Sequence, residues 1–204
     1  NSIINQIANN ISDSILSASL FLSLWSGSRG ISAIIRAINK AYNIKERRNY
    51  IMQKIVSIIF AIALVILIIV VLLTLVFGEM IGNLIFSYIG ATDIFYHIWE
   101  FIRKVIPLIS MIIIFALLYK YSIMPKNRKS IKFIHTLPGA VFTTVGWVIA
   151  SKIFSYYVNN FANYSKTYGS LGGVIVLLVW LYITSIMIVL GGEINGTLAS
   201  IFIY

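Results

Sequence analysis

Long runs of apolar residues constrain this chain more than any other feature. Residues 55–77 and 171–192 carry no charged side chain, and each run can cross the hydrocarbon core of a bilayer, which takes about 20 residues of helix. Residues 138–158 form a similar run, with Pro138 suited to a first helical turn. Residues 107–119 read as the end of a longer helix that begins near Thr92. The pattern predicts a membrane protein with several helical spans.

A fifth span is expected at residues 15–38, although Ser26-Gly27-Ser28-Arg29-Gly30 interrupts its apolar character. Small residues recur in this span every three or four positions, and such stripes let helix backbones approach closely in lipid. A second stripe lies in the fourth span. The two stripes consist of Ser19, Ser23, Gly27, Gly30, Ala33, Ala37 and Ala41, and of Gly139, Thr143, Gly146 and Ala150.

The composition indicates that lipid, rather than water, covers much of the protein surface. Of the 204 residues, 59% are hydrophobic and only 11% are charged, whereas a soluble domain carries about 25% charged residues. No cysteine is present, which excludes disulfides, thiolate metal sites and cysteine nucleophiles. The predicted fold class is all-α, a polytopic transmembrane helical bundle that forms a single domain over residues 1–204 with five spans.

The basic residues predict the orientation, because Lys and Arg gather in cytoplasmic loops. Eleven of the sixteen lie between the first and second spans or between the third and fourth. They are Arg36, Lys40, Lys45, Arg47, Arg48, Lys54, Lys120, Lys126, Arg128, Lys129 and Lys132. The C-terminus is therefore expected in the cytoplasm. An external N-terminus without a signal peptide predicts a further upstream span, which would give six spans with both ends inside.

Two ionisable residues within the spans are candidate site residues. Arg29 lies among small residues in the first span, and Glu193 ends the last span after Gly191 and Gly192. Charged groups inside a bilayer are costly and usually face a partner or a wet cavity. We therefore predict an intramembrane polar pair of Arg29 and Glu193. The alternatives are that each side chain reaches its own interface, or that the two residues line a pathway. Candidate contacts to lipid headgroups are Arg36, Lys40, Arg47, Arg48, Lys126, Arg128 and Lys129.

Several stretches resemble the YihY/BrkB family of bacterial inner-membrane proteins. The matching residues occur in the family's order along nearly the whole chain. They are residues 24–30, 37–42 and 46–48, Tyr119, Pro125, Pro138-Gly139-Ala140, Tyr168-Gly169-Ser170-Leu171-Gly172-Gly173-Val174-Ile175, Trp180-Leu181-Tyr182 and Leu190-Gly191-Gly192-Glu193-Ile194-Asn195. The resemblance implies six membrane helices and a bacterial inner-membrane location, and it supplies no established activity.

Some members of that family carry the label ribonuclease BN, which the residues of this chain do not favour. Metal-dependent cleavage of a phosphodiester needs clustered carboxylates or histidines. Only Glu46, Glu193 and His135 are expected near the cytoplasmic face, and they lie on separate elements. We therefore expect no catalytic residue, metal or cofactor. Basic clusters beside a span more often contact anionic lipid than nucleic acid, so no nucleic-acid partner is expected.

The sequence favours a non-enzymatic, multi-pass inner-membrane protein that handles or transports a lipid or another amphiphile. A small-solute or ion transporter is the first alternative, and it would show helices broken near the midplane. Gly27, Gly30 and Pro107 are the residues that hint at such breaks. A membrane scaffold that recruits partners through its basic loops is the second alternative. Membrane lipids are the expected partners, and a homo-oligomer is compatible with this interpretation.

Overall fold

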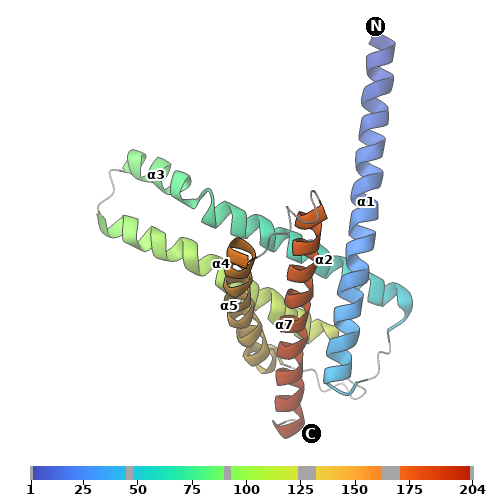
Figure 1. Ribbon diagram of the computed structural model, residues 1–204, viewed down its shortest axis with the longest axis vertical. Coiled ribbons are helices and arrows are strands. Elements are labelled where there is room, and N and C mark those ends of the chain that lie inside the picture. Colours follow the sequence, from blue (N-terminus) through green and yellow to red (C-terminus); the bar gives the residue numbers. More distant parts are fainter. Residues whose placement is uncertain (1, 45–47, 90–92, 124–131, 162–170, 203–204) are drawn as a thin grey trace.

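The computed structural model describes residues 2–44, 48–89, 93–123, 132–161 and 171–202, and every regular element in these ranges is a helix (Figure 1). The predicted all-α membrane bundle is confirmed. In chain order the elements are α1 (Ser2–Ala41), α2 (Tyr50–Leu75), α3 (Gly78–Ile89), α4 (Asp93–Ser122), the 3₁₀ helix η1 (Phe133–Thr136), α5 (Leu137–Phe161) and α7 (Gly172–Phe202).

Four helical segments of the described chain are long and apolar enough to cross a membrane. They are Tyr50–Thr74, His97–Ser122, Phe133–Asn160 and Leu171–Ile201, and they match four of the five predicted spans. The fifth prediction falls on α1, which continues as one helix through Gly27 and Gly30. This helix is long enough to cross a bilayer but is less apolar than the other four long helices. Its serines and central arginine account for that difference.

The helices do not all run in one direction (Figure 1). The helices α1 and α7 run down the picture, whereas α2 and α4 lie across it as a pair, with α3 at the far end of that pair. The helix α4 begins at Asp93, as predicted, and continues through Pro107. The separate helix α3 was not predicted, since the sequence there reads as an extended connection of mixed charge. Crossed helix pairs leave hollows between them that a parallel bundle would close.

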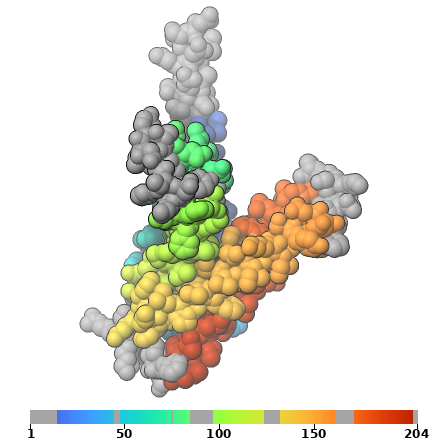
Figure 2. Space-filling view, turned by 90° about the vertical axis from the view of Figure 1, so that its left-hand side faces the viewer, coloured from blue at the N-terminus to red at the C-terminus, as the bar shows by residue number. Residues whose placement is uncertain are grey.

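The second stripe of small residues brings α5 and α7 together. In Figure 2, α5 runs as a yellow-to-orange diagonal over the near face, and the red of α7 shows beneath it. A methyl group on Gly139 would collide with the carbonyl oxygen of Gly191, and one on Gly191 would lie 2.6 Å from the carbonyl oxygen of Gly139. Real Cβ atoms do not approach oxygen so closely, so both positions require glycine. The predicted role of this stripe in packing is confirmed.

Buried polar side chains fix the same junction. The Tyr119 hydroxyl of α4 donates to the carbonyl of Ile188 at 2.7 Å and lies 2.6 Å from Oγ1 of Thr143. The side chain of Asn195, 1% exposed, accepts from the Gly139 N–H at 2.8 Å and donates to the Thr136 carbonyl at 3.0 Å. Gly139 lies in the first turn of α5, where N–H groups have no partner within the helix. Asn195 therefore caps α5 from α7.

The stripe of small residues in α1 behaves differently from the prediction. A methyl group on Gly27 or Gly30 would meet no atom of the described chain within 4 Å, so no backbone in those ranges approaches these residues. The close approach of α1 occurs at its C-terminal end, where a methyl group on Gly196 of α7 would lie 2.7 Å from the carbonyl oxygen of Ala41. Helix α1 therefore packs tightly through its last turn and leaves the middle of the stripe open.

Candidate functional site

The crossing of α1 and α2 is held by polar contacts that are unusual in a pair of membrane helices. The Ser32 hydroxyl of α1 donates to the Ser57 hydroxyl of α2 at 2.8 Å, and Ser57 is fully buried. The Lys54 ammonium donates to the Trp25 carbonyl at 3.1 Å and lies 4.0 Å from the centre of the Trp25 ring. Lys54 is only 8% exposed. A cationic side chain is thus buried at this crossing against an aromatic face.

A hollow of about 310 Å³ opens beside that crossing. Its volume is at the lower end of the range of small-molecule sites. Three of the described residues that line it are positively charged, three are polar and uncharged, and none is acidic. They are Arg29, Arg36 and Lys54, with Ser32, Tyr50 and Gln53. We call these six residues the cationic hollow.

The local sequence explains why positive charge collects here. Arg29, Ser32 and Arg36 are spaced by three and four residues, so they share one face of α1. Tyr50, Gln53 and Lys54 all lie in the first five residues of α2. The N-terminus of a helix carries about half a positive charge and is stabilised by acidic residues or anions. The first turn of α2 has no acidic residue, so the helix end adds to the positive potential of the hollow.

One further feature of the hollow is a buried donor. The side-chain nitrogen of Gln53 is inaccessible to solvent and has no hydrogen-bond partner among the described residues. A buried donor left unpaired costs about 1–3 kcal/mol. The three cations that line the hollow would attract an anion that entered it.

A second hollow, of about 530 Å³, lies at the same helix pair and is nearly all apolar. Its lining residues recur at helical spacing on α1. They are Leu20, Ser23, Leu24, Gly27 and Ile31 of α1, and Ala61, Ile62, Leu64, Val65 and Ile66 of α2. We call it the apolar hollow. Because Gly27 has no side chain, the apolar hollow reaches the backbone of α1. The α1–α2 pair therefore presents one cationic and one apolar recess.

The predicted headgroup contacts fall into three groups. Arg36 lines the cationic hollow, and Lys40 is exposed one turn further along α1 and does not line it. Arg48 donates to the carbonyl of Tyr121, which ties it to the end of α4. The remaining four residues lie outside the described part of the chain: Arg47, Lys126, Arg128 and Lys129.

Arg29 and Glu193 do not come together as predicted. The structure forms no ion pair between these two described residues, and both are exposed. A methyl group on Gly192 would contact Ile38, so Glu193 lies level with about residue 39 of α1. That position is ten residues beyond Arg29, or about 15 Å at the rise of a helix. Glu193 also does not end its span, because α7 continues to Phe202.

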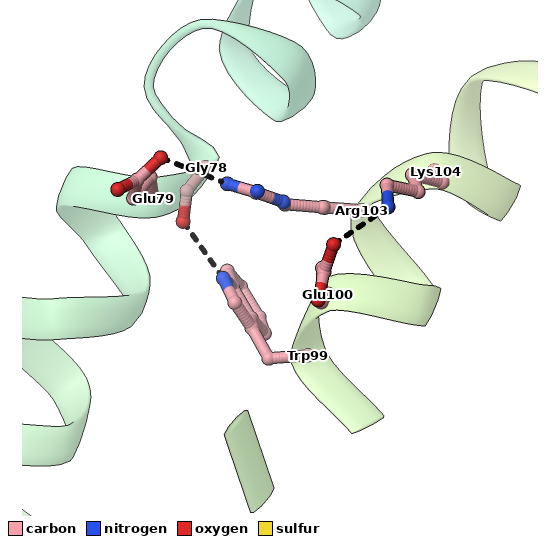
Figure 3. Close-up of polar contacts among 6 residues, drawn as sticks. All are labelled: Gly78, Glu79, Trp99, Glu100, Arg103 and Lys104. Atoms are coloured by element: carbon pink, nitrogen blue, oxygen red, sulfur yellow. Dashed lines mark hydrogen bonds and ion pairs between the residues drawn. The ribbon is translucent and has the colours of Figure 1, made fainter. Parts of the chain in front are cut away.

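Glu79 and Glu100 of the α3–α4 hairpin are engaged in contacts within that hairpin (Figure 3). Trp99 and Arg103 of α4 point toward the start of α3, where the Trp99 indole donates to the Gly78 carbonyl at 2.7 Å and Arg103 lies 3.6 Å from Glu79. Glu100 accepts from Lys104 at 2.6 Å. The Trp99 and Arg103 contacts join α3 to α4, and the Glu100–Lys104 pair lies within α4, so these charged residues have structural roles.

Sequence reasoning missed four of the six residues of the cationic hollow as site residues: Ser32, Tyr50, Gln53 and Lys54. One signal was present, because a lysine close to the N-terminus of a long apolar helix, without an acidic neighbour, is unfavourable for that helix. Among the described residues, no three His, Asp or Glu side chains lie close enough to hold a metal ion.

The fold and these recesses define a multi-pass helical membrane protein with a cationic site between two of its helices. The family model described as Virulence factor BrkB matches residues 1–201. The chain therefore belongs to the BrkB family, as the sequence resemblance indicated. No solved structure matches this chain.

Relatives of known sequence agree with that assignment. A Bacillus subtilis protein named as ribonuclease-like, YfkH, is 46% identical over 172 residues, which cover 84% of this chain and 61% of the relative. A UPF0761 membrane protein of Glaesserella parasuis is 30% identical over 114 residues, 56% of this chain and 38% of the relative. The chain thus spans about three fifths or less of the length of these relatives.

Proposed function

We propose that this chain is a non-enzymatic protein of the bacterial inner membrane that binds and handles an anionic amphiphile at the α1–α2 pair. The observation that carries the proposal is the pairing of two recesses on the same two helices. The cationic hollow suits an anionic head, and the apolar hollow of about 530 Å³ suits hydrocarbon. The proposed orientation places the C-terminus and the cationic hollow toward the cytoplasm, where anionic lipid attracts basic side chains.

Positive charge beside a span is by itself only an orientation signal. Burial distinguishes this site from such a signal, because orientation requires no cation to leave water. Lys54 is 8% exposed, and the Gln53 donor beside it is inaccessible. Burying a cation costs free energy unless its charge is compensated, and an anion in the hollow would add to the compensation that Trp25 gives Lys54.

The transporter alternative finds less support. Helices broken near the midplane are its structural mark, but α1 continues through Gly27 and Gly30, and α4 continues through Pro107. The scaffold alternative rests on the basic loops, and most of their residues lie outside the described ranges. The ribonuclease-like name belongs to YfkH, and no group of the described residues here could hold a metal ion for metal-dependent cleavage.

The test is lipid binding by the purified full chain, measured as lipid adducts in native mass spectrometry from detergent. We expect more adducts with phosphatidylglycerol than with phosphatidylcholine of the same acyl chains. The double variant Arg29→Gln with Arg36→Gln should lose that preference. The control variant, Lys40→Gln with Lys152→Gln, removes the same net charge from exposed residues outside the hollow and should keep it. An equal loss in both variants would show diffuse surface attraction and would overturn the proposal.

A further inference from the structure

The cationic hollow presents more positive charge and more donors than a single monoanionic phosphodiester can use. Two guanidinium groups, one ammonium group and the Gln53 amide line the same recess at the N-terminal turn of α2. We propose that the hollow selects a terminal phosphate group, that is, a phosphomonoester head rather than a phosphodiester. This inference rests on the proposed function and narrows the class of amphiphile.

Charge is the first reason. A phosphomonoester carries about 1.5 to 2 negative charges at pH 7 and has three strong acceptor oxygens, whereas the phosphodiester of a phospholipid carries one charge and two such oxygens. Arg29, Arg36 and Lys54 together carry three positive charges, and no acidic residue is among the described lining residues. The three positive charges of the hollow can therefore neutralise both negative charges of a phosphomonoester. A phosphodiester would neutralise only one of them.

Geometry is the second reason. Arg29 and Arg36 are two helical turns apart on one face of α1, about 10 Å along the helix axis, with Ser32 between them. Their long side chains can converge on one group from both sides, while the first turn of α2 closes the recess opposite. A guanidinium binds phosphate through two parallel hydrogen bonds. A terminal phosphate has three free oxygens that can accept hydrogen bonds from several directions. In a phosphodiester, two of the four oxygens are esterified to bulky substituents, which block approach from those directions.

The buried residues give the recess its specificity. Lys54 is held in place by the Trp25 carbonyl and ring, and its burial means that water does not compensate its charge. Gln53 lines the recess beside Lys54. Exposed lysines such as Lys40 have neither constraint and remain hydrated.

The experiment compares three probes on the purified full chain. Phosphatidic acid has a terminal phosphomonoester, phosphatidylglycerol has a phosphodiester with the same acyl chains, and glycerol 3-phosphate is the soluble form of the first head. We expect phosphatidic acid to bind about ten-fold or more tightly than phosphatidylglycerol, since its phosphomonoester offers the cations more negative charge and a third strong acceptor oxygen. Arg36→Gln should reduce phosphatidic acid binding at least about ten-fold, and the matched Lys40→Gln should change it less than about two-fold.

A second variant guards against loss of folding. Gln53→Glu keeps the size of the side chain and places a carboxylate among the three cations. We expect this variant to unfold at a higher temperature than the wild type while losing phosphatidic acid binding. Loss of binding together with loss of stability would contradict the inference.

The remaining outcomes separate the two proposals. Equal binding of both lipids, lost in Arg36→Gln but not in Lys40→Gln, would overturn the selection of a terminal phosphate and leave the anionic-lipid site standing. Competition by glycerol 3-phosphate at the affinity of the lipid would identify a free phosphate ester as the ligand and overturn the lipid function. No preference for either anionic lipid over phosphatidylcholine would overturn both proposals.

Discussion

Gly191→Ala offers a sharp test of the packing that holds α4, α5 and α7 together. A methyl group at Gly191 would collide with the hydroxyl groups of Thr143 and Tyr119 and with the carbonyl oxygen of Gly139. Overpacking of this kind costs about 1–3 kcal/mol, and the hydrogen bonds that Tyr119 makes to Thr143 and Ile188 contribute about 1 kcal/mol each. Alanine favours the helix by about 1 kcal/mol over glycine, so the expected net loss is about 2–4 kcal/mol.

The matched control is Gly173→Ala, because Gly173 lies in the same helix and a methyl group there would meet nothing within 4 Å. Thermal unfolding in a mild detergent, followed by circular dichroism, should place the midpoint of Gly191→Ala about 4–16 °C below the wild type, at about 2–4 °C per kcal/mol. The midpoint of Gly173→Ala should stay the same or rise slightly. A Gly191→Ala protein as stable as the Gly173→Ala protein would refute the close packing of α5 against α7.

Three further predictions follow from the helix arrangement. A double-mutant cycle of Arg29→Gln and Glu193→Gln should give additive changes in stability, within about 0.5 kcal/mol, since the two groups are not paired; a clear coupling energy would contradict the observed register of α1 and α7. Asn195→Ala should destabilise the protein by about 2–4 kcal/mol in thermal unfolding, because it leaves two buried backbone groups without partners, and an unchanged midpoint would disprove its capping of α5. Single cysteines at Lys45 and Lys166 should react with an impermeant reagent from opposite sides of the membrane, and labelling from the same side would invalidate the proposed orientation.

The sequence alone predicted the class of protein and the position of the long helices. Residues 55–77 and 171–192 are uncharged and apolar, and such a run has one stable conformation in lipid, a helix that satisfies its own backbone. The start of α4 near Thr92 and the place of Pro138 in the first turn of α5 were predicted for the same local reasons. Local signals suffice here because hydrogen bonding within a helix depends only on residues four apart.

The candidate site was only partly predictable, because it depends on which helix faces meet. Two small-residue stripes look alike in sequence, yet Gly139 lies against α7 while Gly27 and Gly30 face open space. Arg29 and Glu193 were expected to pair, but the last turn of α1 packs beside Gly196, which sets a register that separates them.

The tertiary structure decided where the charges collect. Lys54 reads as a loop residue in the sequence, and the crossing of α1 and α2 buries it against Trp25 beside two arginines. The sequence determines each helix from contacts within that helix, whereas the rotation and crossing of helices depend on side chains far apart in the chain. For this reason the sequence was enough to predict a bundle of membrane helices. The cationic hollow became visible only from the packing of α1 against α2.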